Sequence, residues 1–412
     1  MEYLIVAGAA VALVLIVKSS LDTSVTGRAL PVLVLAFIAR LIAHLVVIRG
    51  GILDYGGDNI YYELKALEIV DYWQREGFQY VTSDQISGLS AVTVPCQVFA
   101  LVVYLCQGPA PLACTAVVAL LACGLCVVLY RIARLIGVDE RAAFKLLVLT
   151  AFMPAFLVHT SDMFKDGFNA FLVLACLGLG LSCVKRFDVR KLVALGPLLW
   201  ALWHVRPYMV FMCAVPLVLG VLIARRGMSV PAAGIVAVLL LAAPAFFLTP
   251  LETMQAQLEY GQSAAIRNAN ALANSGIHFA DGGSAWESLH VKVLYTLLAP
   301  FPWTPGSLTL QLGKIDVLLW YYVLYSAGRG LPRLWRQDRR TTLVLLLFII
   351  PSTVVYATSM ANIGLIFRQR MPIVMVVSLL AALAWTRSLA QQNRSAGTPQ
   401  AVADTSPTIG VT

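Results

Sequence analysis

The stretch APLACTAVVALLACGLCVVLY, residues 110–130, decides the fold class. It has no charged side chain, and Arg131 follows it directly. An α-helix needs about 20 apolar residues to cross the hydrocarbon core of a bilayer, where it satisfies its own backbone hydrogen bonds. We therefore predict that this stretch is a transmembrane helix.

Similar apolar runs recur along almost the whole chain of 412 residues, which is 59% hydrophobic and only 12% charged. Soluble domains carry roughly 25% charged residues, so a cytosolic enzyme, a nucleic-acid-binding protein and a disordered protein are excluded. We expect one all-α, polytopic membrane domain over residues 1–390 and a disordered cytoplasmic tail over 391–412. The eleven expected spans are 3–17, 28–48, 110–130, 142–159, 167–184, 191–204, 209–224, 229–249, 311–328, 341–357 and 367–386.

Basic residues concentrate in the cytoplasmic loops of membrane proteins, and here they predict the orientation. All the basic clusters fall on one side if the apolar stretch 89–107 lies along the outer surface instead of crossing. The clusters are Lys18/Arg28, Arg131/Arg134/Arg141, Lys185/Arg186/Arg190/Lys191, Arg225/Arg226 and Arg329/Arg333/Arg336/Arg339/Arg340. We therefore expect two outer loops, at about 49–109 and 250–310. Apolar positions at helical spacing from Ile60 to Arg75 predict an amphipathic helix at the membrane interface.

Ionisable groups in a membrane protein are expensive and indicate functional sites, and here nearly all of them lie near the expected outer ends of helices. Asp58 follows two glycines that allow a tight turn, and Tyr61 and Tyr62 follow it. A carboxylate beside the membrane surface can act as a general base. The alternative is a helix cap, since Asp is a favoured N-cap residue. Both roles are compatible.

A second polar group joins the fourth and fifth expected spans and contains His159, Asp162, Lys165 and Asp166. One interpretation is an ion pair that caps two helix ends. The other is a binding site in which Lys165 contacts a phosphate and an aspartate contacts a sugar hydroxyl or a metal ion.

Two further groups carry arginines on the side where the charge rule does not expect them. His204 and Arg206 lie in a tight turn, and Arg368 and Arg370 precede the last span. Arginine favours bidentate contact with phosphate or carboxylate. The cluster therefore predicts a phosphate-bearing lipid substrate, and salt bridges to the nearby acids are the alternative.

Arg40 and His44 lie four residues apart on one face of the second span. They either line the same cavity or extend to the lipid headgroups.

Several of these segments resemble multi-spanning proteins of bacterial exopolysaccharide and O-antigen clusters, and the overall pattern resembles the GT-C superfamily of integral-membrane glycosyltransferases. The segments are Gly57-Asp58 with Tyr61-Tyr62, Pro154–Ser161 with Lys165-Asp166, Arg206-Pro207-Tyr208, Pro300–Trp303 and Asn362–Arg370. The resemblance implies that Asp58 is the catalytic base. It also implies a polyprenyl-(pyro)phosphate sugar donor, a glycan or lipid acceptor, and an active face on the periplasmic side of the bacterial inner membrane.

The expected mechanism is that of an inverting glycosyltransferase. The leaving phosphate needs preorganised cations, a role expected of Lys165, Arg206, Arg368 and Arg370. No Asp-x-Asp or Glu-x-Asp pair occurs in the first outer loop, so a divalent cation, Mg or Mn, stays open as a cofactor. The alternatives are a Wzy-type polysaccharide polymerase or ligase, and a flippase or transporter of lipid-linked sugars.

Overall fold

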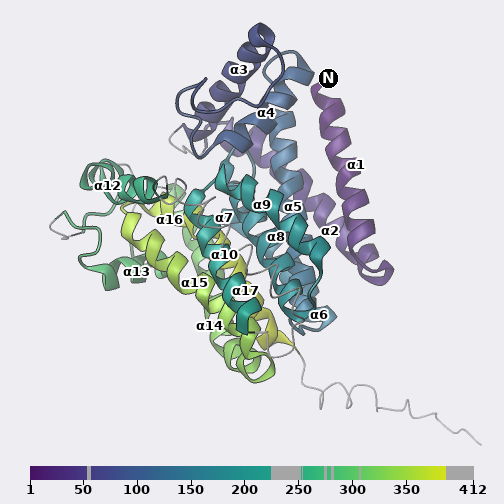
Figure 1. Ribbon diagram of the computed structural model, residues 1–412, viewed down its shortest axis with the longest axis vertical. Helices are drawn as coiled ribbons and strands as arrows, with labels where there is room; N and C mark the ends of the chain where they lie inside the picture. The colour runs from purple at the N-terminus through teal and green to yellow at the C-terminus, as the bar shows by residue number, and fades with distance from the viewer. Residues whose placement is uncertain are drawn as a thin grey trace, which may run out of the picture.

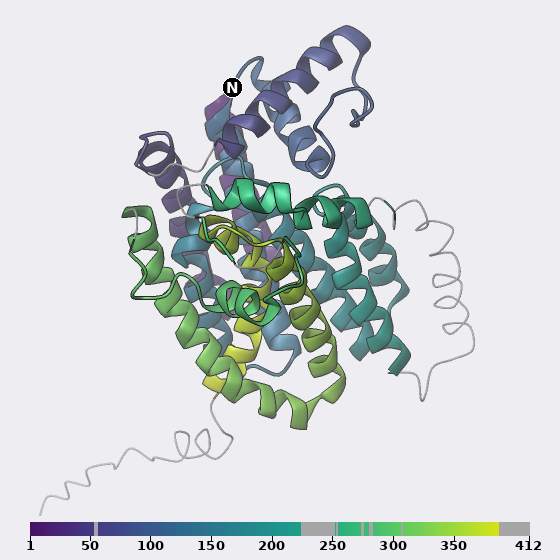
Figure 2. The same cartoon turned by 90° about the vertical axis from the view of Figure 1, so that its left-hand side faces the viewer.

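The computed structural model describes residues 1–52, 57–223, 252, 254–272, 276–279, 283–305 and 308–386, and these residues are all-helical apart from one isolated bridge between Gly276 and Asn362. Figures 1 and 2 show the arrangement. The helices are α1 (Glu2–Ser20), α2 (Thr23–Ala43), η1 (His44–Ile48, a π-helical continuation of α2), α3 (Asp58–Glu76), α4 (Thr93–Cys106), α5 (Pro111–Leu135), α6 (Glu140–Ala151), α7 (Pro154–Val158), α8 (Lys165–Lys185), α9 (Val189–Trp203), α10 (Pro207–Ile223), α12 (Ala264–Ala271), α13 (Leu289–Leu298), α14 (Leu308–Gln337), α15 (Arg339–Ser359), α16 (Ile363–Gln369) and α17 (Met371–Trp385).

Several helices are long and apolar enough to span a membrane. Among the described residues there are five: α1, α2 with η1, α5, α8 and α15. A sixth is possible if α16 and α17, which meet at a bend of 57°, form one broken span. Apolar side chains on α1 and α2, including Leu15 and Leu35, are more than half exposed, as expected of helices that face lipid.

The prediction of eleven spans is therefore confirmed only in part. The expected span 142–159 is broken, because Pro154 starts α7 and lacks the N–H that would continue α6. The helices α9 and α10 have 15 and 17 residues, which is short for a 30 Å hydrocarbon core. The expected span 229–249 and the tail 391–412 lie outside the described residues.

The basic loops meet at one end of the helices, called here the basic end. Arg28 pairs with Glu140, and Lys185 donates to the carbonyl of Leu135 at 2.6 Å and pairs with Asp338 at 3.6 Å. These contacts join four of the basic clusters. The fifth, Arg225/Arg226, lies outside the described residues. The helices α3 and α4 lie at the opposite end, at the top of Figure 1, called here the α3 end.

The apolar stretch 89–107 forms α4, which keeps both of its ends at the α3 end. Just before α4, the carbonyl of Ala91 accepts a hydrogen bond from Lys165 at the start of α8. Just after it, α5 begins where the backbone N–H of Leu112 donates to Glu2 of α1. A helix of 14 residues is about 21 Å long, too short to cross the hydrocarbon core.

The amphipathic helix predicted from Ile60 to Arg75 is confirmed as α3. Its packed face carries Tyr62, Ala66 and Trp73, which are buried. Of the apolar positions that predicted this helix, Ile60 and Leu64 are each 53% exposed, whereas Val70 is buried and Leu67 packs against the core. Only the first turns of the apolar stripe are therefore free to contact lipid.

Candidate functional site

Asp58 opens α3 directly after Gly57, whose φ of +82° lies in the left-handed region that favours glycine. The carboxylate is 44% exposed, and its Oδ2 lies 2.5 Å from Nη1 of Arg368 on α16. Asp58 therefore stands at the edge of the protein but is already paired with an arginine.

Asp166 on α8 lies at the centre of the same group. Its Oδ1 accepts a hydrogen bond from Nη2 of Arg206 at 3.1 Å, and its Oδ2 accepts one from Nε of Arg368 at 2.8 Å. Asp166 is only 1% exposed. Arg368 thus bridges two carboxylates, and four segments distant in sequence meet. We call Asp58, Asp166, Arg206 and Arg368 the arginine–carboxylate cluster.

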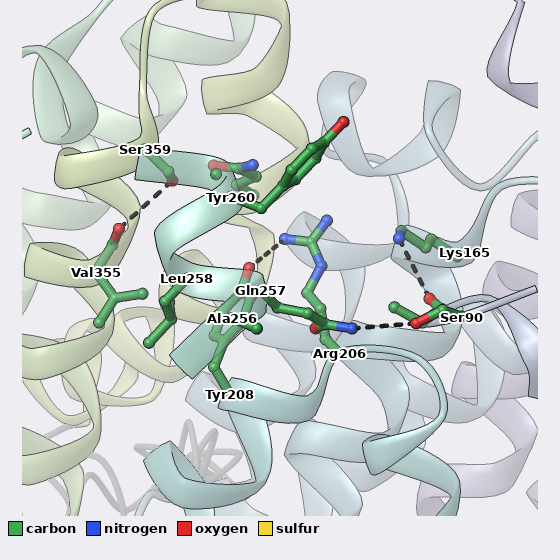
Figure 3. Close-up of a pocket in the computed structure, with 13 residues that line it drawn as sticks. Ser90, Lys165, Arg206, Tyr208, Ala256, Gln257, Leu258, Tyr260, Val355 and Ser359 are labelled. Carbon is green, nitrogen blue, oxygen red and sulfur yellow. Dashed lines mark hydrogen bonds between the residues drawn. The ribbon is translucent and has the colours of Figure 1, made fainter. Parts of the chain in front are cut away.

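A pocket of about 630 Å³ opens beside this cluster (Figure 3). Arg206 belongs to both, and Lys165 joins it in the pocket wall, where its Nζ donates to the carbonyl of Ala91 at 3.3 Å. Among the described residues, the wall contains these two cations and no carboxylate. The other lining residues are Ser90, Ala91, Tyr208, Ala256, Gln257, Leu258, Tyr260, Gly261, Val355, Ser359 and Gln369. The pocket is therefore suited to an anionic ligand.

Asp162 is close to the cluster in sequence but is fully buried, with 0% of its surface exposed. Its oxygens accept hydrogen bonds from Nδ2 of Asn59 at 2.8 Å and from the N–H of Met163 at 2.7 Å. Burial would raise the pKa of Asp162, but the hydrogen bond from His44 and the charge of Arg49 outweigh burial and lower it. Asp162 is thus a buried anion held by its neighbours.

The two tyrosines after Asp58 point in different directions. The hydroxyl of Tyr61 donates to the carbonyl of Gly88 at 2.7 Å. Tyr62 is buried, and burial together with the negative charges of Asp58 and Asp166 raises the pKa of its hydroxyl well above the usual range. Tyr62 is therefore a neutral neighbour of the cluster.

Two candidate residues, Arg370 and His204, lie apart from the cluster, whereas His159 is close enough to Arg368 and Asp166 to feel their charges. Arg370 is buried and contacts the carbonyl of Ala299 at 2.8 Å and Asp316 at 3.8 Å. The ring of His204 packs against that of Trp200 at a tilt of 44°, with the ring centroids 4.5 Å apart, and His159 is buried. The structure therefore does not place Arg370 with the other proposed phosphate ligands.

Arg40 and His44, which were expected either to share a cavity or to reach the headgroups, are both buried. Nε of Arg40 donates to the hydroxyl of Thr160 at 2.8 Å, and His44 lies 3.4 Å from Asp162. Neither side chain extends to the surface.

The side chains that the structure describes do not fit a divalent metal ion. Within the described part of the chain, no group of three or more His, Cys, Asp or Glu side chains is arranged to hold one. The two carboxylates of the cluster already bind arginines.

Sequence reasoning missed two parts of the site. Asn59 gave no signal beyond its place next to Asp58. The helical segment 254–262, which supplies Gln257 and Tyr260 to the pocket wall, has no charged cluster that would have marked it. Nothing in local spacing shows that this segment lies over Arg206 (Figure 3).

No known family model matches this chain, and no curated protein matches it. Its chemistry is therefore inferred from the residues of the site. The arrangement offers a half-exposed carboxylate, three cations and a pocket, which together suit transfer of a group away from a phosphate.

Proposed function

We propose that the chain is an integral-membrane glycosyltransferase that moves a sugar from a polyprenyl-(pyro)phosphate donor to a glycan or lipid acceptor. In this proposal it is a multi-span bundle of the bacterial inner membrane, and its α3 end faces the periplasm. Its products contribute to extracellular polysaccharide or O-antigen. The basic loops at the opposite end support this orientation, because such loops face the cytoplasm.

One observation carries the proposal: the half-exposed carboxylate of Asp58 stands beside a pocket that contains Lys165 and Arg206. A hydroxyl acceptor is a poor nucleophile at neutral pH, so a positioned base assists as its C–O bond forms. In the proposed reaction Asp58 takes that proton.

The leaving phosphate develops negative charge as the sugar departs. Preorganised cations in a site of low dielectric constant stabilise such charge. Lys165 and Arg206 line the pocket, and Arg368 is held next to them by Asp166. In the proposed reaction these three side chains bind the phosphate, and Asp166 holds the two arginines in place.

A Wzy-type polymerase or ligase is the second candidate. It moves whole lipid-linked repeat units and depends on arginines more than on an acidic base. The ion pair between Asp58 and Arg368 favours this candidate, since it neutralises the carboxylate. A flippase fits less well, because transporters place their binding sites near the middle of the membrane, whereas this cluster lies toward the α3 end.

The test compares Asp58→Asn with Arg368→Ala in a deletion strain at equal expression. For a glycosyltransferase we expect Asp58→Asn to lower polysaccharide output by about 100-fold or more, the usual contribution of a general base. Glu76→Gln, at the other end of α3, is the control and should keep full output.

Two results would contradict the glycosyltransferase. Full output from Asp58→Asn with loss from Arg368→Ala would favour the polymerase. Full output from both variants would place the reaction elsewhere in the chain.

A further inference from the structure

The proposed reaction leaves one carboxylate of this region without a role. Asp162, in the connector between α7 and α8, is fully buried and does not line the pocket. Its Oδ2 accepts a hydrogen bond from Asn59, and its Oδ1 accepts one from the N–H of Met163. A buried side chain with these partners is unable to contact a ligand in the pocket, so its role lies in what it holds.

Asp162 connects the start of α3 to the end of the second span. His44 and Arg49 lie 3.4 Å and 3.6 Å from its carboxylate oxygens. Arg49 also donates to Glu63 at 2.8 Å. Because Asn59 and Glu63 are four residues apart, they lie on the same face of α3. The first two turns of α3 are therefore attached at two points.

This attachment determines where Asp58 points. Asp58 directly precedes Asn59, so it lies about 100° around the helix from it. While Asn59 is held by Asp162, Asp58 is directed toward Arg368, 2.5 Å away. Loss of the contact between Asn59 and Asp162 would let the first turn of α3 shift.

We infer that Asp162 is a positioning residue for Asp58, acting through its hydrogen bond from Asn59. The inference rests on the proposed function, in which Asp58 is the base. A catalytic group displaced by about 1 Å loses roughly 100-fold in rate, so this contact controls turnover without touching substrate.

The experiment exchanges the two partners. Asn59→Asp places two carboxylates face to face, which repel each other. Asp162→Asn removes the charge that attracts His44 and Arg49. In the double variant Asn59→Asp/Asp162→Asn, the amide at position 162 can donate to the new carboxylate and still accept from the N–H of Met163. The hydrogen bonds are restored with donor and acceptor reversed.

Two readouts are measured on the full chain: polysaccharide output at equal expression, and hydrogen–deuterium exchange of residues 58–64 in detergent. For Asn59→Asp we expect faster exchange at the start of α3 and output lowered by about 100-fold. For the double variant we expect slow exchange again and output within about threefold of the natural protein, because the hydrogen bond is re-formed.

Asp338→Asn is the matched control. Asp338 also accepts from a backbone N–H, that of Thr341, and pairs with Lys185, but it lies at the basic end. It should change neither the exchange of α3 nor the output.

The inference is overturned if exchange at residues 58–64 is unchanged in Asn59→Asp. It is also overturned if the double variant stays as inactive as the single variants. If Asp58→Asn keeps full output, the proposed function fails on its own. The exchange measurement would then still decide whether Asp162 holds the start of α3.

Discussion

At the scale of single residues, the cluster is organised by charge. Arg206 and Arg368 balance the charges of Asp58 and Asp166 within the cluster, and Lys165 in the adjacent pocket wall adds one positive charge. The group therefore retains one positive charge. Both arginines are paired with carboxylates, whereas the contact found for Lys165 is to a backbone carbonyl. Lys165 is thus the cation most available to an anionic ligand.

Lys165→Ala removes this cation from the pocket wall. We expect the donor concentration at half-saturation to rise by about 10- to 150-fold, since a hydrogen bond to a charged group contributes about 1.5–3 kcal/mol. The maximal rate should change less, because Arg206 and Arg368 remain. The measurement is the rate of donor consumption at increasing donor concentration.

Lys185→Ala is the control for Lys165→Ala. It removes the lysine at the other end of the same helix, the basic end of α8. The donor concentration at half-saturation should stay unchanged. An unchanged half-saturation in Lys165→Ala would show that the pocket does not bind the donor.

At the scale of elements, local sequence predicts the helices better than it predicts their neighbours. The helix α3 follows from its apolar spacing, and α5 follows from its uncharged length. The break between α6 and α7 was missed, although Pro154 is present in the sequence, because the apolar run continues across it.

The candidate site shows the same division. Polar residues near helix ends mark Asp58, Arg206 and Arg368 as candidates. Spacing along the chain carries no information on which helices are adjacent. The convergence of Arg206 and Arg368 on Asp166, and the separate position of Arg370, therefore require the three-dimensional structure.

The pairing of α14 with α17 leads to a prediction at this scale. A Cβ added at Gly330 of α14 would lie 1.8 Å from the backbone oxygen of Leu380 on α17, whereas one added at Gly328 would meet nothing within 4 Å. Small residues let membrane helices approach closely. Gly330→Ala should therefore separate the two helices and destabilise the protein by about 1–3 kcal/mol.

Gly328→Ala, in the same helix, should be neutral or stabilise by about 0.5–1 kcal/mol, because alanine favours the helical backbone. Thermal unfolding in detergent measures both changes. Equal unfolding temperatures for the two variants would contradict the close contact between α14 and α17.

At the scale of the whole molecule, charge and hydrophobicity separate two ends. The basic loops meet at one end, and the arginine–carboxylate cluster, the pocket and α3 lie toward the other. This separation predicts that the α3 end faces away from the cytoplasm. A lipid-linked donor would then reach the pocket from the outer leaflet.

Labelling from outside the cell tests this orientation. Ser87 lies in the exposed loop before α4, and Arg186 lies in an exposed loop of the basic end. Each is replaced by cysteine in a separate variant, Ser87→Cys or Arg186→Cys. Of the eight native cysteines, Cys106 is partly exposed and the others are buried, so both variants are made with Cys106→Ser. A membrane-impermeant maleimide should label position 87 in intact cells and position 186 only after permeabilisation. The reverse pattern would invert the orientation.

Transfer of a sugar from a lipid phosphate by the arginine–carboxylate cluster can be measured with purified full-length protein in vesicles. The probe is the radiolabelled lipid-linked sugar fraction extracted from cells that lack this protein. The natural protein should move label from lipid to acceptor and release polyprenyl (pyro)phosphate, and Asp58→Asn should not. Movement of intact labelled lipid between leaflets without release of its sugar would contradict the account.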